Sequence, residues 1–163
     1  MKVEEKPDYV YQRNQLILGS SDETQTETQK KSKGKIGIPR ALLVHSLFPL
    51  YSTFFKELGY EVVLSKIDKE RELMTNAAFC FPIQILHGAV LDLVKKKDIT
   101  RIFLPHVHNL PKGDKWLDAT FCPITQASPY FISTTFKNVD FLKPVLDYSE
   151  GYENSDALIT MAV

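Results

Sequence analysis

Short apolar runs alternate with amphipathic helical segments along most of this chain, and this alternation restricts the fold more than any other feature. The runs at 36–38, 61–65 and 101–105 have the length and composition of buried strands. Strands that alternate with helices pair in parallel through right-handed crossovers. The sequence therefore predicts an α/β fold, an open, mostly parallel, Rossmann-like sheet with helices on both faces, from residue 36 to about residue 147.

The first predicted helix is the most regular. Large apolar side chains recur at steps of three and four residues over 47–58, with Ser46 as a candidate N-cap, Pro49 in the first turn and Gly59 just past the end. A fourth strand within 139–148 would be confined to an edge of the sheet by Pro144, which has no N–H for a central ladder.

Two further helices each begin beside a cysteine. One starts at Cys80 or Phe81, and the other starts after Cys122 and is expected to kink or end at Pro129. Because successive strand-to-helix junctions of a right-handed parallel fold emerge at the same edge, we expect both cysteines on the same side of the sheet.

The chain divides into three parts. Residues 1–19 form a short N-terminal segment that is too small to fold alone, and 20–35 carry no apolar side chain, so we expect a solvated linker there. Residues 36–163 make up the α/β domain. The small upstream segment suggests a fragment of a longer protein.

The charge balance argues against two classes of partner. Twenty basic and 20 acidic residues give a formal net charge of zero, so no basic field marks the chain for nucleic acid or an anionic membrane surface. No apolar run approaches the roughly 18 residues of a membrane span, and the N-terminus is too charged for a signal peptide. Two cysteines are too few for a disulfide scaffold. We expect a soluble cytoplasmic protein with reduced thiols.

The two cysteines are the main chemical lead. A helix N-terminus favours a thiolate, which is the form that ligates metals or attacks electrophiles, so Cys80 and Cys122 are candidate ligands or nucleophiles. Free cysteine is also among the most buried residue types. The interpretation that both thiols are ordinary core side chains therefore stays open.

Other candidates lie near the carboxyl ends of the predicted strands, where open parallel sheets bind ligands. Arg40 follows the first strand, and His106 follows the third, with His108 two positions later. The two histidines could hold a metal side by side, or could be surface polar groups. His87, beside Gly88, lies about two helical turns after Cys80, and packing or a polar contact is the alternative to a binding role.

Several motifs are missing from the sequence. It contains no glycine-rich phosphate loop, no GxSxG elbow and no HExxH helix. We expect no nucleotide site and no complete active site in this chain.

Four motifs in order carry a family resemblance. They are KIGIPRALLVHSLFPLYSTFFKELGYEVVLS, CFPIQILHGAVLDLVKK, RIFLPHV and CPITQASPYFI. Together, from about residue 35 to residue 132, they resemble the DUF2229-like accessory domain found downstream of the ATPase modules in large activators of 2-hydroxyacyl-CoA dehydratases. Those proteins belong to the BadF/BcrA-type activase and benzoyl-CoA reductase group.

The resemblance implies roles for particular residues. Cys80 and Cys122 match family cysteines that ligate a four-iron four-sulfur cluster, and Arg40 lies in the opening signature GIPRAL. The family often has lysine at Gln84 and histidine at Ala89, so no role transfers to those positions. Such a cluster takes about three or four cysteines, so with only two here it is incomplete in this chain. The remaining ligands then lie downstream or in another chain, or the site is vestigial.

The resemblance also implies a function and partners. It predicts an accessory domain of an ATP-driven electron-transfer protein that works with an ATPase module and a 2-hydroxyacyl-CoA dehydratase. Two alternatives stay open: a non-catalytic interaction domain with structural cysteines, and a zinc or small-ligand site built from both cysteines and a histidine. The sequence leaves the oligomeric state open.

Overall fold

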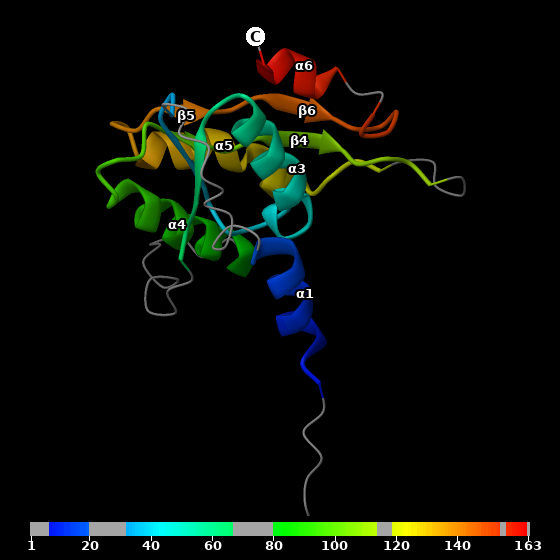
Figure 1. Cartoon of the computed structure of the whole chain (residues 1–163). Coiled ribbons are helices and arrows are strands. Elements are labelled where there is room, and N and C mark those ends of the chain that lie inside the picture. The colour runs from blue at the N-terminus through cyan, green and yellow to red at the C-terminus, as the bar shows by residue number, and fades with distance from the viewer. Residues whose placement is uncertain (1–6, 20–31, 67–79, 114–118, 154–155, 163) are drawn as a thin grey trace, which may run out of the picture.

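The computed structural model describes residues 7–19, 32–66, 80–113, 119–153 and 156–162, and these form an α/β fold, as the sequence predicts (Figure 1). The elements in chain order are α1 (Tyr9–Leu18), β1 (Lys35–Ile38), α3 (Val44–Glu57), β2 (Glu61–Leu64), α4 (Phe81–Val94), β3 (Arg101–Phe103), β4 (His106–Asn109), α5 (Pro123–Thr135), β5 (Phe141–Leu142), β6 (Val145–Asp147) and α6 (Ala157–Ala162). Among the described helices, none is long and apolar enough to cross a membrane.

The central sheet has four parallel strands in the order β2-β1-β3-β5, which confirms the three strands predicted from the apolar runs. A second, two-stranded parallel sheet joins β4 to β6. It continues the β3–β5 pair past two prolines. The backbone N–H of Leu104 donates to Leu142 O at 2.8 Å, and that of His106 donates to Pro144 O at 2.9 Å.

Pro105 and Pro144 explain why each strand is split in two. Neither residue can donate to a ladder, so pairing stops at both and resumes beyond them. The sequence placed His106 in a loop and predicted one strand within 139–148. In the structure His106 begins β4, and that segment forms two strands, with β5 at the sheet edge as Pro144 requires.

Helices cover both faces of the central sheet (Figure 1). Side chains of β1 alternate between the faces, since Ile36 and Ile38 pack with α3, while Gly37 faces α4. A Cβ on Gly37 would lie 3.2 Å from the Ile99 side chain, so this position suits glycine. The first core cluster joins α1, α3, β4 and β6, and the second joins α4, α5 and β3.

The start of α3 differs from the prediction. The N-cap is Leu43, not Ser46, and the helix begins at Val44, which places Pro49 in the second turn. A proline has no N–H, so the carbonyl four residues earlier, that of His45, loses its helical donor. Gly59 follows the helix with φ +88°, as its predicted position past the end requires.

Helix α1 supplies the missing donor. The Arg13 guanidinium donates to His45 O and to Ser46 Oγ, both at 3.0 Å. Farther along α1, Leu18 is 4% exposed within the first core cluster. The N-terminal segment therefore packs on the domain through the hydrogen bonds of Arg13 and the apolar contacts of Ile17 and Leu18.

Helix α5 runs through Pro129 to Thr135, so of the two predicted alternatives, a kink or an end at Pro129, the end does not occur. The carbonyl that Pro129 leaves without a helical donor is that of Thr125. Ser128 Oγ donates to this carbonyl at 2.7 Å, and the Ser128 side chain is buried. A neighbouring hydroxyl thus replaces the missing N–H.

Most of the predicted linker, residues 20–31, lies outside the described residues, so its solvation stays a prediction. Ser32 and Lys33 are described and exposed, and the backbone N–H of Lys33 donates to Gly59 O at 3.0 Å. The chain is therefore paired with the end of α3 before β1 begins.

Candidate functional site

Both cysteines occupy N-cap positions, Cys80 on α4 and Cys122 on α5. The two helices lie side by side on one face of the sheet, where the His87 and Phe131 rings stack with centroids 6.3 Å apart. The prediction that both cysteines stand at helix N-termini on the same side of the sheet is confirmed. A proline follows at N2 of α4 and at N1 of α5, where its missing N–H costs no helical bond.

Cys122 has the environment of a reactive thiol. It is exposed, and the nearby backbone N–H groups of Thr125 and Ile124 lower the pKa of the thiol, with a further contribution from the Thr125 hydroxyl, although the sulfur makes no capping hydrogen bond. Donors directed at the sulfur stabilise the thiolate. Cys122 is therefore able to act as a nucleophile or as a metal ligand.

Cys80 lies in a different environment. Its side chain is half-buried and packs against the second core cluster, which includes Ile83 and Leu86 of the same helix. The next residue, Phe81, is 58% exposed and so is not a core side chain. Within the described residues, no three or more His, Cys, Asp or Glu side chains come together as a metal site would require.

Arg40 lies at the carboxyl end of β1. It belongs to the edge of the sheet formed by the carboxyl ends of the strands, which we call the rim. Its backbone N–H donates to Ser65 Oγ at 2.8 Å, which joins the ends of β1 and β2. Burial lowers the pKa of His45, and the positive charges of Arg40 and Arg13 lower it further. This corner of the rim is therefore cationic through its arginines, with His45 held toward the neutral form.

His106 is held by two side chains of α5. Gln126 Nε2 donates to Phe121 O at 2.7 Å, so its Oε1 is the atom that faces His106 Nε2 at 3.2 Å. This arrangement assigns the proton to Nε2. His106 Nδ1 then accepts from the Tyr130 hydroxyl at 3.2 Å.

His108 contacts the next residue of its own strand and one residue of the neighbouring strand β6. Its Nδ1 lies 3.1 Å from Asn109 Nδ2 and 3.4 Å from Asp147 Oδ2. The backbone N–H of Ser149 is the main cause that lowers the pKa of Asp147 to about 2. The ring centroids of His106 and His108 are 6.3 Å apart, and each ring contacts protein groups, so the structure does not present them as a prepared metal pair.

His87 and Gly88 lie away from the rim. His87 Nδ1 is 3.2 Å from Ile83 O in the preceding turn of α4, and the ring packs beside Phe131 and Phe136. Gly88 is half-buried in the middle of α4. The structure does not bring either residue together with Cys122 or His106.

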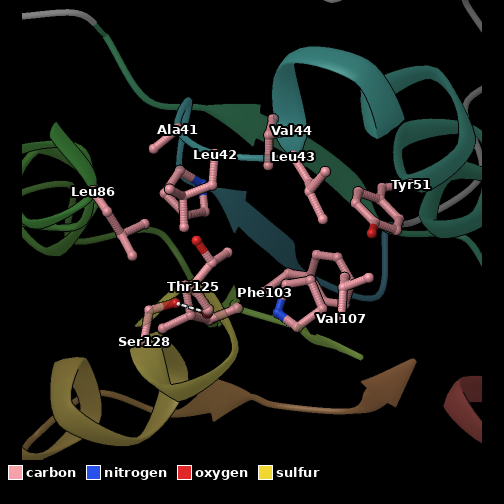
Figure 2. Close-up of a pocket in the computed structure, with 13 residues that line it drawn as sticks. Ala41, Leu42, Leu43, Val44, Tyr51, Leu86, Phe103, Val107, Thr125 and Ser128 are labelled. Atoms are coloured by element: carbon pink, nitrogen blue, oxygen red, sulfur yellow. Dashed lines mark hydrogen bonds between the residues drawn. The ribbon is translucent and has the colours of Figure 1, made fainter. Parts of the chain in front are cut away.

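A small cavity opens between the loop at 39–43, called here the rim loop, and the helices, and no local sequence pattern indicates it (Figure 2). Its volume is about 30 Å³, and its walls come from the loop at 39–43, from Tyr51 of α3, from Leu86 of α4 and from Thr125 of α5. It therefore lies between the helices that begin at the two cysteines. The i, i+4, i+8 spacing of Cys122, Gln126 and Tyr130 was a visible signal that one face of α5 carries polar groups.

The family comparison covers most of the chain. Residues 35–162 match the model of the family described as CoA enzyme activase uncharacterised domain (DUF2229). The chain belongs to this family. The match extends the sequence resemblance past residue 132 to include β5, β6 and α6, and it associates this DUF2229 domain with the activation of a CoA enzyme. No curated protein and no solved structure matches the chain.

The state of the Cys122 thiol gives a direct prediction for this DUF2229 domain. In a Cys80→Ser variant, we expect alkylation of Cys122 by iodoacetamide to reach half its maximal rate at a pH below the ordinary thiol value of about 8.5, because the α5 N–H groups stabilise the thiolate. Mass spectrometry of timed samples across a pH series measures the rate. The same variant unfolded in concentrated urea is the control and should show the ordinary midpoint. Equal midpoints in the folded and unfolded chains would contradict the prediction.

Proposed function

We propose that this chain is an accessory domain of an ATP-driven activator of a 2-hydroxyacyl-CoA dehydratase, and that Cys80 and Cys122 supply two ligands of an iron–sulfur cluster. The observation that carries the proposal is the placement of both cysteines as N-caps of neighbouring helices on one face of the sheet. Family membership supports the activator role. The four ordered motifs support the dehydratase system.

The residues present fit part of a cluster site. A four-iron four-sulfur cube takes about four cysteine ligands, and the whole sequence contains two. The other ligands must then come from outside this chain. When bound, the cluster would supply low-potential electron transfer. The contribution of this chain would be the exposed Cys122 thiolate and the half-buried Cys80.

The ATP chemistry belongs to another module in this proposal. The sequence has no glycine-rich phosphate loop, so a separate ATPase module would hydrolyse ATP and the dehydratase would receive the electron. The balanced charge favours protein partners in the cytoplasm over nucleic acid or a membrane surface.

The test uses the complete protein that carries this domain, purified without oxygen. We expect Cys122→Ser and Cys80→Ser each to lose most of the bound iron and sulfide and most of the activation of the dehydratase, because a cube that lacks one thiolate is held poorly. Ser133→Ala, at a half-buried position near the end of α5, is the matched control and should leave both quantities unchanged. Iron and activation that stay at the wild-type level in both cysteine variants would refute the cluster role.

A second candidate is a non-catalytic interaction domain with structural cysteines. The packing of Cys80 against the second core cluster favours it. In that case Cys80→Ser would lower stability but leave iron and activation unchanged. Zinc in place of iron in the purified protein would instead indicate a zinc site of Cys80, Cys122 and a histidine.

A further inference from the structure

The cavity lies where a parallel sheet usually binds its ligand. It opens at the carboxyl ends of β1 and β3, and Leu42, Leu86 and Thr125 approach it from three different elements (Figure 2). Most of its wall is apolar, and none of the side chains that line it is charged. A charged ligand would lose its hydration there without gaining a partner, so the walls favour an uncharged one.

The rim loop is strained at the cavity. Leu42 has φ +53°, the left-handed conformation, which is unfavourable for a branched side chain. Among the described residues, Leu42 is the only one other than glycine with a positive φ. Strain of this kind gathers at segments that contact ligands. The Leu42 side chain lies across the cavity from Thr125 (Figure 2).

A buried hydroxyl at the cavity lacks a partner. Tyr51 lines the wall and is 0% exposed, and its hydroxyl makes no hydrogen bond within the described residues. The hydroxyl of Tyr148 is likewise buried and lies near enough to that of Tyr51 for each to shift the pKa of the other, but the two do not meet at the distance and angle of a hydrogen bond. Burial raises the pKa of Tyr51, so it stays a neutral phenol and a proton donor. A buried hydroxyl without a hydrogen bond is destabilising, and an acceptor atom would offset that cost.

We propose that this cavity binds a small uncharged group that has a short aliphatic body and one carbonyl oxygen. The body would contact Leu42, Leu86 and Val107, and the oxygen would accept a hydrogen bond from Tyr51. The volume of about 30 Å³ limits the enclosed part, since one water needs about 10–15 Å³ by this measure. This proposal does not depend on the cluster role of the cysteines.

The test titrates the full chain with isobutyramide and follows the leucine and valine methyl groups by NMR. We expect saturable shifts at Leu42, Leu86 and Val107, and binding of isobutyrate that is about tenfold weaker or less, because the carboxylate must be desolvated. Tyr51→Phe should weaken isobutyramide binding about threefold to tenfold through loss of one hydrogen bond.

Two cavity-filling variants test whether the shifts come from binding inside the cavity. Thr125→Leu and, from the opposite wall, Ala41→Val should each abolish the shifts. Thr134→Leu, at an exposed position near the end of α5, is the control and should retain them. The proposal fails if no saturable shift appears, if isobutyrate binds as well as isobutyramide, or if the shifts persist in whichever filled variant keeps a folded spectrum.

Discussion

Phe103→Ala is expected to lower the free energy of unfolding by about 3–5 kcal/mol, the range for removing a fully buried phenylalanine. Phe103 is 0% exposed at the end of β3. Its ring meets Tyr51 edge to face at 4.8 Å and Phe55 at 5.0 Å. Aromatic pairs of this geometry add about 0.5–1.5 kcal/mol beyond the buried area. Alanine would lose both contacts and leave a void beside the cavity.

Urea unfolding followed by circular dichroism measures this change. Phe81→Ala is the matched control, because Phe81 is 58% exposed at the start of α4 and its removal should shift stability by only about 0.5 kcal/mol. A Phe103 variant that loses no more stability than the Phe81 variant would show that the core near the rim rearranges to fill the void.

The parts of the fold that the sequence predicted well are those whose signal is local. The strands β1, β2 and β3 are apolar runs, and α3 and α4 have regular apolar spacing, so their positions follow from pattern alone. β4 was missed because its sequence HVHN places only Val107 in the core, and its pairing with β6 depends on residues about 40 positions away. The N-cap of α3 was missed because Leu43 has no side-chain oxygen, whereas Ser46 has one.

In the candidate site, too, the features with a local sequence signal were predictable and those that depend on distant residues were not. A cysteine followed by a proline at the head of an apolar run predicted both N-cap positions correctly. The environments of the two thiols could not be predicted, because exposure depends on how α4 and α5 pack. The contacts of His106 with Gln126 and Tyr130 join residues 20 and 24 positions apart, and no local pattern encodes them. The cavity likewise depends on five segments that meet only in the folded chain.

Removal of the Ser128 hydroxyl is the second substitution for which we expect a large loss of stability, because this hydroxyl replaces the backbone donor that Pro129 lacks. Ser128→Ala would leave the carbonyl of Thr125 without its 2.7 Å hydrogen bond in a buried position, so we expect a loss of about 1–3 kcal/mol in unfolding free energy. In a Pro129→Ala background, the new N–H of residue 129 can donate to the same carbonyl. There the Ser128 substitution should cost only a few tenths of a kcal/mol, within the usual range for a change that removes no needed partner.

The double-mutant cycle isolates this replacement, since only a shared acceptor makes the two substitutions depend on each other. Ser133→Ala is the matched control: its hydroxyl also donates three residues back, to Tyr130 O at 2.8 Å, and accepts from Lys143 Nζ at 3.1 Å, but the Tyr130 carbonyl keeps its helical donor. Its cost should be small and equal in both backgrounds. If Ser128→Ala costs the same with Pro129 as with Ala at 129, the hydroxyl does not substitute for the missing N–H. The continuation of α5 past Pro129 would then have to rest on the packing of Ile132 in the second core cluster.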